Sequence, residues 1–227
     1  MPPAFDSSPE SGAFKHDVRA EIAAAAARLI VEDGADWTSA KRKAAQAVLG
    51  EGAAHRGALP DRAEMESAVR AYLRSFQPDE HRALLAGLRR AALSLMRRLE
   101  TFDPHLTGAV LNGTATAHSD LRLALFCDSA KDVEVALMEA GLDFEALEGG
   151  SQEPRPEEVL AFLWPTPRAL GLPPSLRQLG VHLEVFGPQA RRLAPRASAV
   201  ENGMHPLEGL GRAGIAQLET LLNETAP

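Results

Sequence analysis

The pattern of apolar and polar residues is helical over the first part of the chain. Apolar positions recur there every three or four residues, the period of a helix that buries one face. The alanine-rich segment 15–33 consists of strong helix formers and stops at Gly34, a residue that favours helix ends. Residues 1–14 are rich in Pro, Ser and Gly, and we expect them to form a disordered tail. The sequence therefore predicts a helical region over residues 15–101.

Three further helices are expected in this region. Thr38 is suited to cap a short helix, and Asp61 with Glu64 has the spacing of a capping box at the start of another. A longer helix is expected after Pro78. Apolar residues at helical spacing predict the buried faces of the last two helices: Met65, Val69, Tyr72, Leu73 and Phe76, then Leu84, Leu88, Ala92, Leu95 and Leu99.

After residue 101 the long helical pattern gives way to short apolar runs that are compatible with β-strands. A helix-like segment at 131–141 separates these runs, and residues 209–224 are expected to form a closing helix. The runs cover residues 106–111, 121–126, 159–164 and 181–186, and the Gly- and Pro-rich segments 149–156 and 165–175 are expected to be loops. We therefore predict an α+β fold, in which the N-terminal helical region packs on a small mixed β-sheet within residues 102–227.

The two-residue period of a strand also predicts which side chains share a face of this sheet. Apolar residues of two runs would face the core: Leu121, Leu123 and Leu125, with Val181, Leu183 and Val185. Polar residues and one phenylalanine would lie on the opposite face: Asp120 and Arg122, with His182, Glu184 and Phe186.

Composition narrows the class of protein. With 227 residues, 45% of them hydrophobic, the chain can bury a substantial core. Cys127 is the only cysteine, so no intramolecular disulfide can form, and a reducing cytoplasm is the expected location. The longest apolar run, 22–30, is interrupted by Arg28 and is too short to span a bilayer, so we expect no membrane insertion. The net charge of −7 argues against a protein that coats nucleic acid, although local patches could still bind RNA or nucleotides.

The segment 106–126 carries the candidate chemistry. A short apolar strand ends at Gly108, a turn rich in small residues follows, and a second strand starts beside Ser119 and Asp120. A strand, a turn of small residues and a carboxylate at the start of the next strand can together form a site for phosphate and metal.

This segment resembles the signature of nucleotidyltransferases of the DNA polymerase beta superfamily, especially the small bacterial ones related to kanamycin nucleotidyltransferase. Gly108 and Gly113 match its two glycines without gaps, residues 114–116 match its spacer, and residues 119–121 match the start of its carboxylate strand. The resemblance implies that Gly108, Gly113, Thr114 and Ser119 bind substrate or phosphate, and that Asp120 is a catalytic and metal-binding residue.

Two departures fall on the chemistry itself. Ala109 stands where the family has a phosphate-contacting serine, and Arg122 stands where it has the second metal-binding aspartate. In that family three carboxylates hold two Mg²⁺ ions, which a lone Asp120 cannot do. The third carboxylate comes from a later strand, where Glu184 is the candidate for both catalysis and metal binding. Because arginine is permanently charged, Arg122 could replace the metal by pairing with Glu184 or Asp120 and could contact substrate phosphate.

The resulting prediction is a nucleotidyltransferase-like protein with a degenerate active site that binds a nucleotide, RNA or a protein partner. One alternative is an active nucleotidyltransferase that moves NMP from NTP with an altered metal set, in which Asp120 and Glu184 are ligands and Arg122 contacts the triphosphate. A second alternative is a scaffold without enzymatic activity, whose helices supply the interface. Oligomeric state, acceptor and base preference are left open by the sequence.

Simpler interpretations stay open beside each feature. The turn before Asp120 also suits plain loop and capping chemistry. The pairs His118–Asp120 and His182–Glu184 could converge on a transition metal, although two such pairs also arise by chance. Basic residues on the helices could contact phosphates or simply form solvated faces: Lys41, Arg42, Lys43, Arg89, Arg90, Arg97 and Arg98. Cys127 could be a nucleophile only with a nearby base, and a buried inert thiol is the alternative.

Overall fold

The computed structural model describes residues 10–50, 59–149, 154–195, 197–198 and 200–225. Within these ranges it contains seven α-helices and one six-stranded mixed sheet, so the α+β prediction is confirmed. The chain divides into two compact units, residues 1–78 and 79–227. The helices are α1 (Glu10–Asp33), α2 (Trp37–Leu49), α3 (Arg62–Phe76), α4 (Pro78–Arg98), α5 (Gly108–Asn112), α6 (Ala130–Glu139) and α7 (Ile215–Glu224). The strands are β1 (His105–Thr107), β2 (Leu121–Phe126), β3 (Phe144–Leu147), β4 (Glu158–Pro165), β5 (Gln178–Phe186) and β6 (Arg212–Gly214).

The first unit consists of α1, α2 and α3 around a small aliphatic core. The capping box of α3 is confirmed: Asp61 Oδ1 accepts from the Glu64 amide at 2.9 Å, and Glu64 Oε2 accepts from the Asp61 amide at 2.6 Å. Two sequence predictions need correction. Helix α1 begins at Glu10, so residues 10–14 belong to a helix, while residues 1–9 lie outside the described part. Asp36, and not Thr38, caps α2, because its carboxylate accepts the first free amides.

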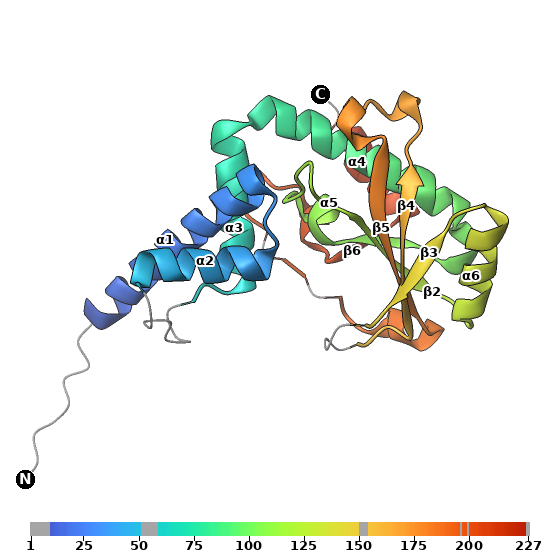
Figure 1. The fold of residues 1–227 in the computed structure, drawn as a ribbon, viewed down its shortest axis with the longest axis horizontal. Coiled ribbons are helices and arrows are strands. Elements are labelled where there is room, and N and C mark those ends of the chain that lie inside the picture. Colours follow the sequence, from blue (N-terminus) through green and yellow to red (C-terminus); the bar gives the residue numbers. More distant parts are fainter. Residues whose placement is uncertain (1–9, 51–58, 150–153, 196, 199, 226–227) are drawn as a thin grey trace, which may run out of the picture. The chain divides into compact units, whose positions relative to one another are not determined.

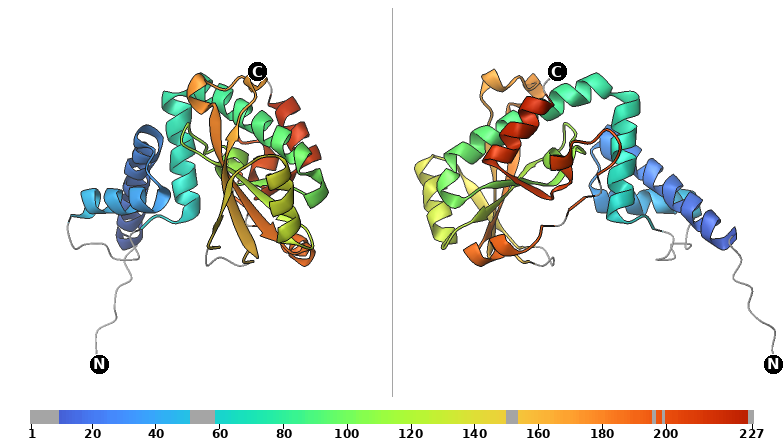
Figure 2. Two further views of the ribbon diagram at one scale, coloured as in Figure 1. Left: turned by 45° about the vertical axis from the view of Figure 1, so that its right-hand side comes forward. Right: turned by 180° about the vertical axis from the view of Figure 1, so that it is seen from behind.

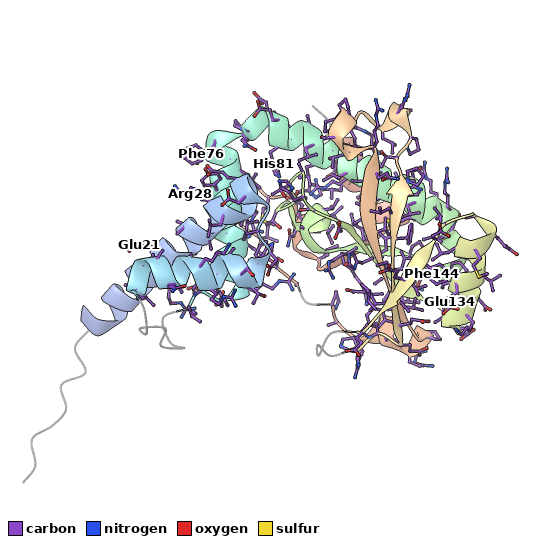
Figure 3. All side chains as sticks on the ribbon, in the orientation of Figure 1. Glu21, Arg28, Phe76, His81, Glu134 and Phe144 are labelled. Carbon is purple, nitrogen blue, oxygen red and sulfur yellow. The ribbon has the colours of Figure 1, made fainter. Side chains whose placement is uncertain are left out.

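The buried stripe predicted for α3 is mostly correct. Met65, Val69 and Leu73 are buried, whereas Phe76 is 67% exposed at the end of the helix (Figure 3). Phe76 instead stacks on Tyr72 of the preceding turn, with ring centroids 4.5 Å apart. The predicted stripe is therefore one residue too long.

Helix α4 belongs to the second unit, so the division of the chain falls after Pro78 and not after residue 101 as predicted. The reason is the apolar stripe of α4, in which Leu88, Ala92, Leu95 and Leu99 are buried in the same core as the sheet. The second unit is a two-layer structure, in which α4, α6 and α7 cover one face of the sheet (Figures 1 and 2).

The sheet has the strand order β3-β4-β5-β2-β1-β6. Strands β2 and β5 are parallel, and every other neighbouring pair is antiparallel. The predicted alternation is confirmed on the covered face, where Leu121, Leu123, Leu125, Val181, Leu183 and Val185 are all buried. We call the opposite side the polar face; it carries His105 and Thr107 of β1, Arg122 of β2, and His182 and Glu184 of β5.

Three local predictions in this unit were incomplete. Residues 108–112 form a single-turn helix, α5, where a strand end and turn were expected. Strands β3 and β6 were not predicted, because four and three residues are too few to show a period. The closing helix begins at Ile215 and not at residue 209, because β6 occupies Arg212–Gly214. Within the described residues, no helix is both long and apolar enough to cross a membrane.

Candidate functional site

The parallel pairing of β2 with β5 brings the predicted site residues together on the polar face. In this register Arg122 lies beside His182, and Ala124 lies beside Glu184. Asp120 directly precedes β2 and comes level with Gly180. Side chains from two segments about sixty residues apart in sequence therefore meet on adjacent strands.

Each charged side chain of the first segment reaches diagonally to the second strand. His182 Nε2 donates to Asp120 Oδ2 at 3.1 Å, and Arg122 Nη1 donates to Glu184 Oε1 at 3.3 Å. The Arg122–Glu184 pair is one of the two arrangements expected from the sequence. The hydrogen bond between Asp120 and His182 was not foreseen, since the two residues were considered together only as possible ligands of one transition metal. The polar face thus carries two parallel acid–base pairs.

Gly180 makes the first of these pairs possible. The Asp120 carboxylate lies directly over Gly180, where an added Cβ would overlap Oδ1. A glycine at this position of β5 lets the carboxylate lie flat against the strand, within reach of His182. Gly180 is a site residue that sequence analysis missed, although a glycine inside an otherwise apolar strand is a recognised signal of close approach.

The partners of Asp120 favour its ionised carboxylate, and both pairs are partly exposed. The hydrogen bond from His182 lowers the pKa of Asp120, partial burial opposes this, and the charge of Arg122 adds to the lowering. The Arg122 side chain is half exposed, and Glu184 is partly exposed. Exposed ion pairs of this kind contribute only about 0–1 kcal/mol, so a ligand can exchange with either partner at small cost.

Thr107 at the end of β1 and Gly108 at the start of α5 both lie against Arg122. Gly108 has a φ of +69°, which favours glycine, and Arg122 Cδ would lie 3.3 Å from a Cβ at this position. Thr107 Oγ1 donates to the Arg122 carbonyl at 3.2 Å. Gly108 therefore lies directly against the side chain of Arg122.

Other residues of the motif act within the loop. The buried Thr114 hydroxyl donates to Asn112 Oδ1 at 2.7 Å, so its side chain faces the interior. Gly113 ends α5 with a φ of +79°. Ser119 Oγ accepts from the Thr116 amide at 2.9 Å and shapes the approach to Asp120. These contacts agree with the capping role that the sequence left open for this turn.

A buried ion pair beneath α5 was not predicted. Arg89 was expected on a solvated helix face, but it is 2% exposed and its guanidinium donates to Glu208 Oε1 at 2.5 Å. It also donates to the carbonyls of Val110 and Leu111, at 3.1 and 2.9 Å. Burial lowers the pKa of Arg89, and Glu208 counteracts the shift. Arg89 therefore holds α5, and with it the loop that leads to Asp120.

The donor set does not fit the two-metal site of the resembled family. Arg122 occupies the place of one carboxylate, and the carboxylates of Asp120 and Glu184 are each bound to a basic side chain. Across the part of the chain that the structure describes, no three His, Cys, Asp or Glu side chains gather as a metal site would require. His118, the other candidate ligand, is exposed in the loop before β2.

The remaining candidate residues make contacts that suit a structural role. Cys127 is partly buried, its Sγ contacts the Ser129 carbonyl, and burial raises the pKa of the thiol, which disfavours the nucleophilic thiolate. Lys41 donates to the Pro60 carbonyl at 3.1 Å. On α4, Arg90 donates to the Leu170 carbonyl, and Arg97 pairs with Glu219 at 2.6 Å.

Comparison of the chain with protein-family models, with curated proteins and with solved structures gave no match in any of the three.

Proposed function

We propose that this protein is a nucleotidyltransferase-like binding protein, in which Arg122 takes the place of the metal and the polar face binds a nucleotide without Mg²⁺. The observation that carries the proposal is the pair of diagonal contacts, Asp120–His182 and Arg122–Glu184, on adjacent parallel strands.

The charge of the site supports a metal-free role. A cluster of three carboxylates repels a triphosphate until divalent cations neutralise it. Here one carboxylate is replaced by Arg122, and Asp120 and Glu184 are each paired with a base. Divalent cations are then not needed to neutralise the site.

The exposure of Arg122 supports a binding mode in which phosphate replaces Glu184 as the partner of the guanidinium. A guanidinium binds phosphate through two parallel hydrogen bonds. The single carboxylate of Glu184 offers Arg122 no stronger contact than a phosphate would. Because the Arg122 side chain is 50% exposed, leaving Glu184 costs little free energy. Because Gly108 has no side chain, the stem of Arg122 can lie close to the backbone there.

The topology around the site also supports the proposal. An antiparallel pair, β1 and β2, is joined through a short helix and a loop of small residues, and a parallel strand, β5, supplies the later carboxylate. This is the strand-loop-strand arrangement that the resemblance implies.

The test is calorimetric titration of the full chain with ATP and with GTP, each with and without Mg²⁺. The proposal predicts binding that is equally strong in both conditions and that Arg122→Gln weakens roughly tenfold, as expected for loss of a charge-assisted phosphate contact. Arg168→Gln, which removes an exposed arginine elsewhere in the second unit, is the matched control and should bind as the wild type does.

Two outcomes would overturn the proposal. Binding that requires Mg²⁺ and disappears in Asp120→Ala would favour an active transferase with an altered metal set, and would justify a search for its acceptor. Absence of binding to either nucleotide would favour a scaffold.

A further inference from the structure

An exposed leucine lies beside the Asp120–His182 pair on the polar face. Leu163 of β4 pairs with Gly180 of β5 in the antiparallel register, and side chains paired in this way lie on the same face of a sheet. Leu163 is 62% exposed, whereas the residues on either side of it in β4 are buried on the covered face. Because the Asp120 carboxylate lies over Gly180, it is the neighbour of Leu163 across β5. An apolar surface and a carboxylate therefore meet on the polar face.

The Asp120 carboxylate can accept hydrogen bonds from a ligand. Oδ2 accepts from His182 Nε2 at 3.1 Å, whereas Oδ1 accepts no hydrogen bond within the described residues. The side chain of Asp120 is about half exposed, so a ligand on the polar face can reach it. An ionised carboxylate has about four lone-pair sites and no donor. Asp120 can therefore accept two further hydrogen bonds while it keeps His182 as a partner.

Arg122 lies on the same face, two residues after Asp120 along the chain. The two charges do not form a hydrogen-bonded pair with each other, because Arg122 donates to Glu184 and Asp120 accepts from His182. Both charges thus remain available to different groups of one ligand. The polar face offers a cation for phosphate, an acceptor for N–H groups and an apolar surface for a flat ring. A phosphorylated ligand with an N–H-bearing ring is complementary to all three.

We infer that the ligand of the polar face is a guanine nucleotide, whose base packs on Leu163 and donates from its Watson–Crick edge to Asp120. The inference rests on the proposed function, in which Arg122 binds the phosphate. Among the four bases of RNA, only guanine presents two adjacent donors on this edge, the N1–H and the 2-amino group. Adenine presents one donor beside the acceptor N1, which would face a carboxylate oxygen without a hydrogen bond. Asp120 is then the specificity-determining residue, and His182 is a positioning residue.

The ionisation of Asp120 supports the choice of base. The hydrogen bond from His182 lowers the pKa of Asp120, so the group is a carboxylate at neutral pH and has no proton to donate to adenine N1. A charged acceptor also binds N–H donors more strongly than a neutral one does. The same contact that holds the carboxylate over Gly180 therefore keeps it an acceptor only.

The test is calorimetric titration of the full chain with GTP, ATP and ITP, all without Mg²⁺. The base of ITP keeps the N1–H of guanine but lacks the 2-amino group. We expect GTP to bind at least about tenfold more tightly than ATP, as a two-bond contact to a base edge predicts. The affinity for ITP should lie between the two.

Variants of the two contact residues test each contact separately. The amide of Asp120→Asn accepts from N1–H but has a donor in place of the second acceptor, so it matches xanthine, which has a carbonyl in place of the 2-amino group. This variant should lose the preference for GTP over ATP and bind XTP more tightly than the wild type does. Leu163→Ser should weaken the binding of GTP and ATP alike, because it removes only the apolar surface. Met138→Ser, at an exposed apolar residue of α6, is the matched control and should leave both affinities unchanged.

The outcomes distinguish this inference from the proposed function. Equal affinity for GTP and ATP, with both weakened by Arg122→Gln, would overturn the guanine preference and leave the phosphate site in place. A preference for GTP that persists in Asp120→Asn would overturn the role of Asp120 in reading the base. Absence of binding to all of these nucleotides would overturn the proposed function, and the inference with it.

Discussion

Two arginine–glutamate pairs in the second unit have the same chemistry in opposite surroundings. The Arg89–Glu208 pair is buried, at 2.5 Å, and Arg89 also satisfies two backbone carbonyls of α5. The Arg122–Glu184 pair lies on the polar face, at 3.3 Å, with the arginine half exposed. Because a buried charge cannot lose its partner without a large desolvation cost, the first pair is fixed, whereas the second can be exchanged for a ligand. Arg89 therefore has a structural role, whereas Arg122 can bind a ligand.

The largest expected effect is therefore at Arg89. Arg89→Ala leaves Glu208 as an unpaired buried charge and two carbonyls without donors, and should lower the free energy of unfolding by about 3–5 kcal/mol. Chemical denaturation measures this. A loss below about 1 kcal/mol, the range of an exposed pair, would remove the contrast between the two pairs.

As the pH falls, the two histidines His81 and His105 should lower the stability of the protein before the polar face does. Burial lowers the pKa values of His81 and His105, so the unfolded chain binds more protons than the folded chain below the ordinary value of 6.5. Their contribution to the free energy of unfolding is then fully present at neutral pH. It falls as the pH drops from about 6.5 toward the lowered pKa values of the folded state, by up to about 1.4 kcal/mol per pH unit for each histidine.

Denaturation curves of the wild type and His81→Gln between about pH 7 and pH 5 measure this effect. His81→Gln keeps a donor for the Ala115 carbonyl but takes up no proton, so its stability should fall less steeply. The polar face should respond later: the lowered pKa of Asp120 means that its contribution is present above 3.8 and is lost only as the pH falls through the lower folded value. An identical pH dependence in both proteins would contradict the role of His81.

A smaller effect is expected at Gly180. In Gly180→Ala the new Cβ displaces the Asp120 carboxylate and breaks its hydrogen bond to His182, which should cost about 0.5–1.5 kcal/mol. The same change made in Asp120→Ala has no carboxylate to displace and should be nearly neutral. A double-mutant cycle followed by denaturation measures the coupling, and additive effects would show that the two residues act separately.

The smallest effect on stability is expected at Arg122. Arg122→Gln should change the free energy of unfolding by less than about 1 kcal/mol, and added salt should reduce even that difference. Denaturation at low and at high salt checks this prediction. A loss as large as that of Arg89→Ala would mean that the polar-face pair is structural, and exchange with a ligand would then be too costly.

Where the chain repeats a period, the sequence was enough to predict the structure. The leucines of β2 and the alternation in β5 predict that Asp120, Arg122 and Glu184 share one face, and the pairing of the two strands agrees with this. The contacts of Arg89 could not be predicted, because Glu208 is 119 residues away and the helical pattern shows only that Arg89 is polar. His105 is a similar case: its surroundings depend on β6, a three-residue strand without a visible period. Helix α5 was missed because its five residues, Gly108–Asn112, are too few to show a helical period and include an apolar run that is compatible with a strand.

The central proposal is that Arg122 occupies the place of a metal ion. The measurement is Mn²⁺ binding, followed by water proton relaxation, in the wild type, Arg122→Asp and Asp120→Asn. We expect no specific Mn²⁺ binding in the wild type and a gain of binding in Arg122→Asp, which places the carboxylate of the resembled motif beside Asp120 and Glu184. Stoichiometric Mn²⁺ binding in the wild type that Asp120→Asn abolishes would contradict it.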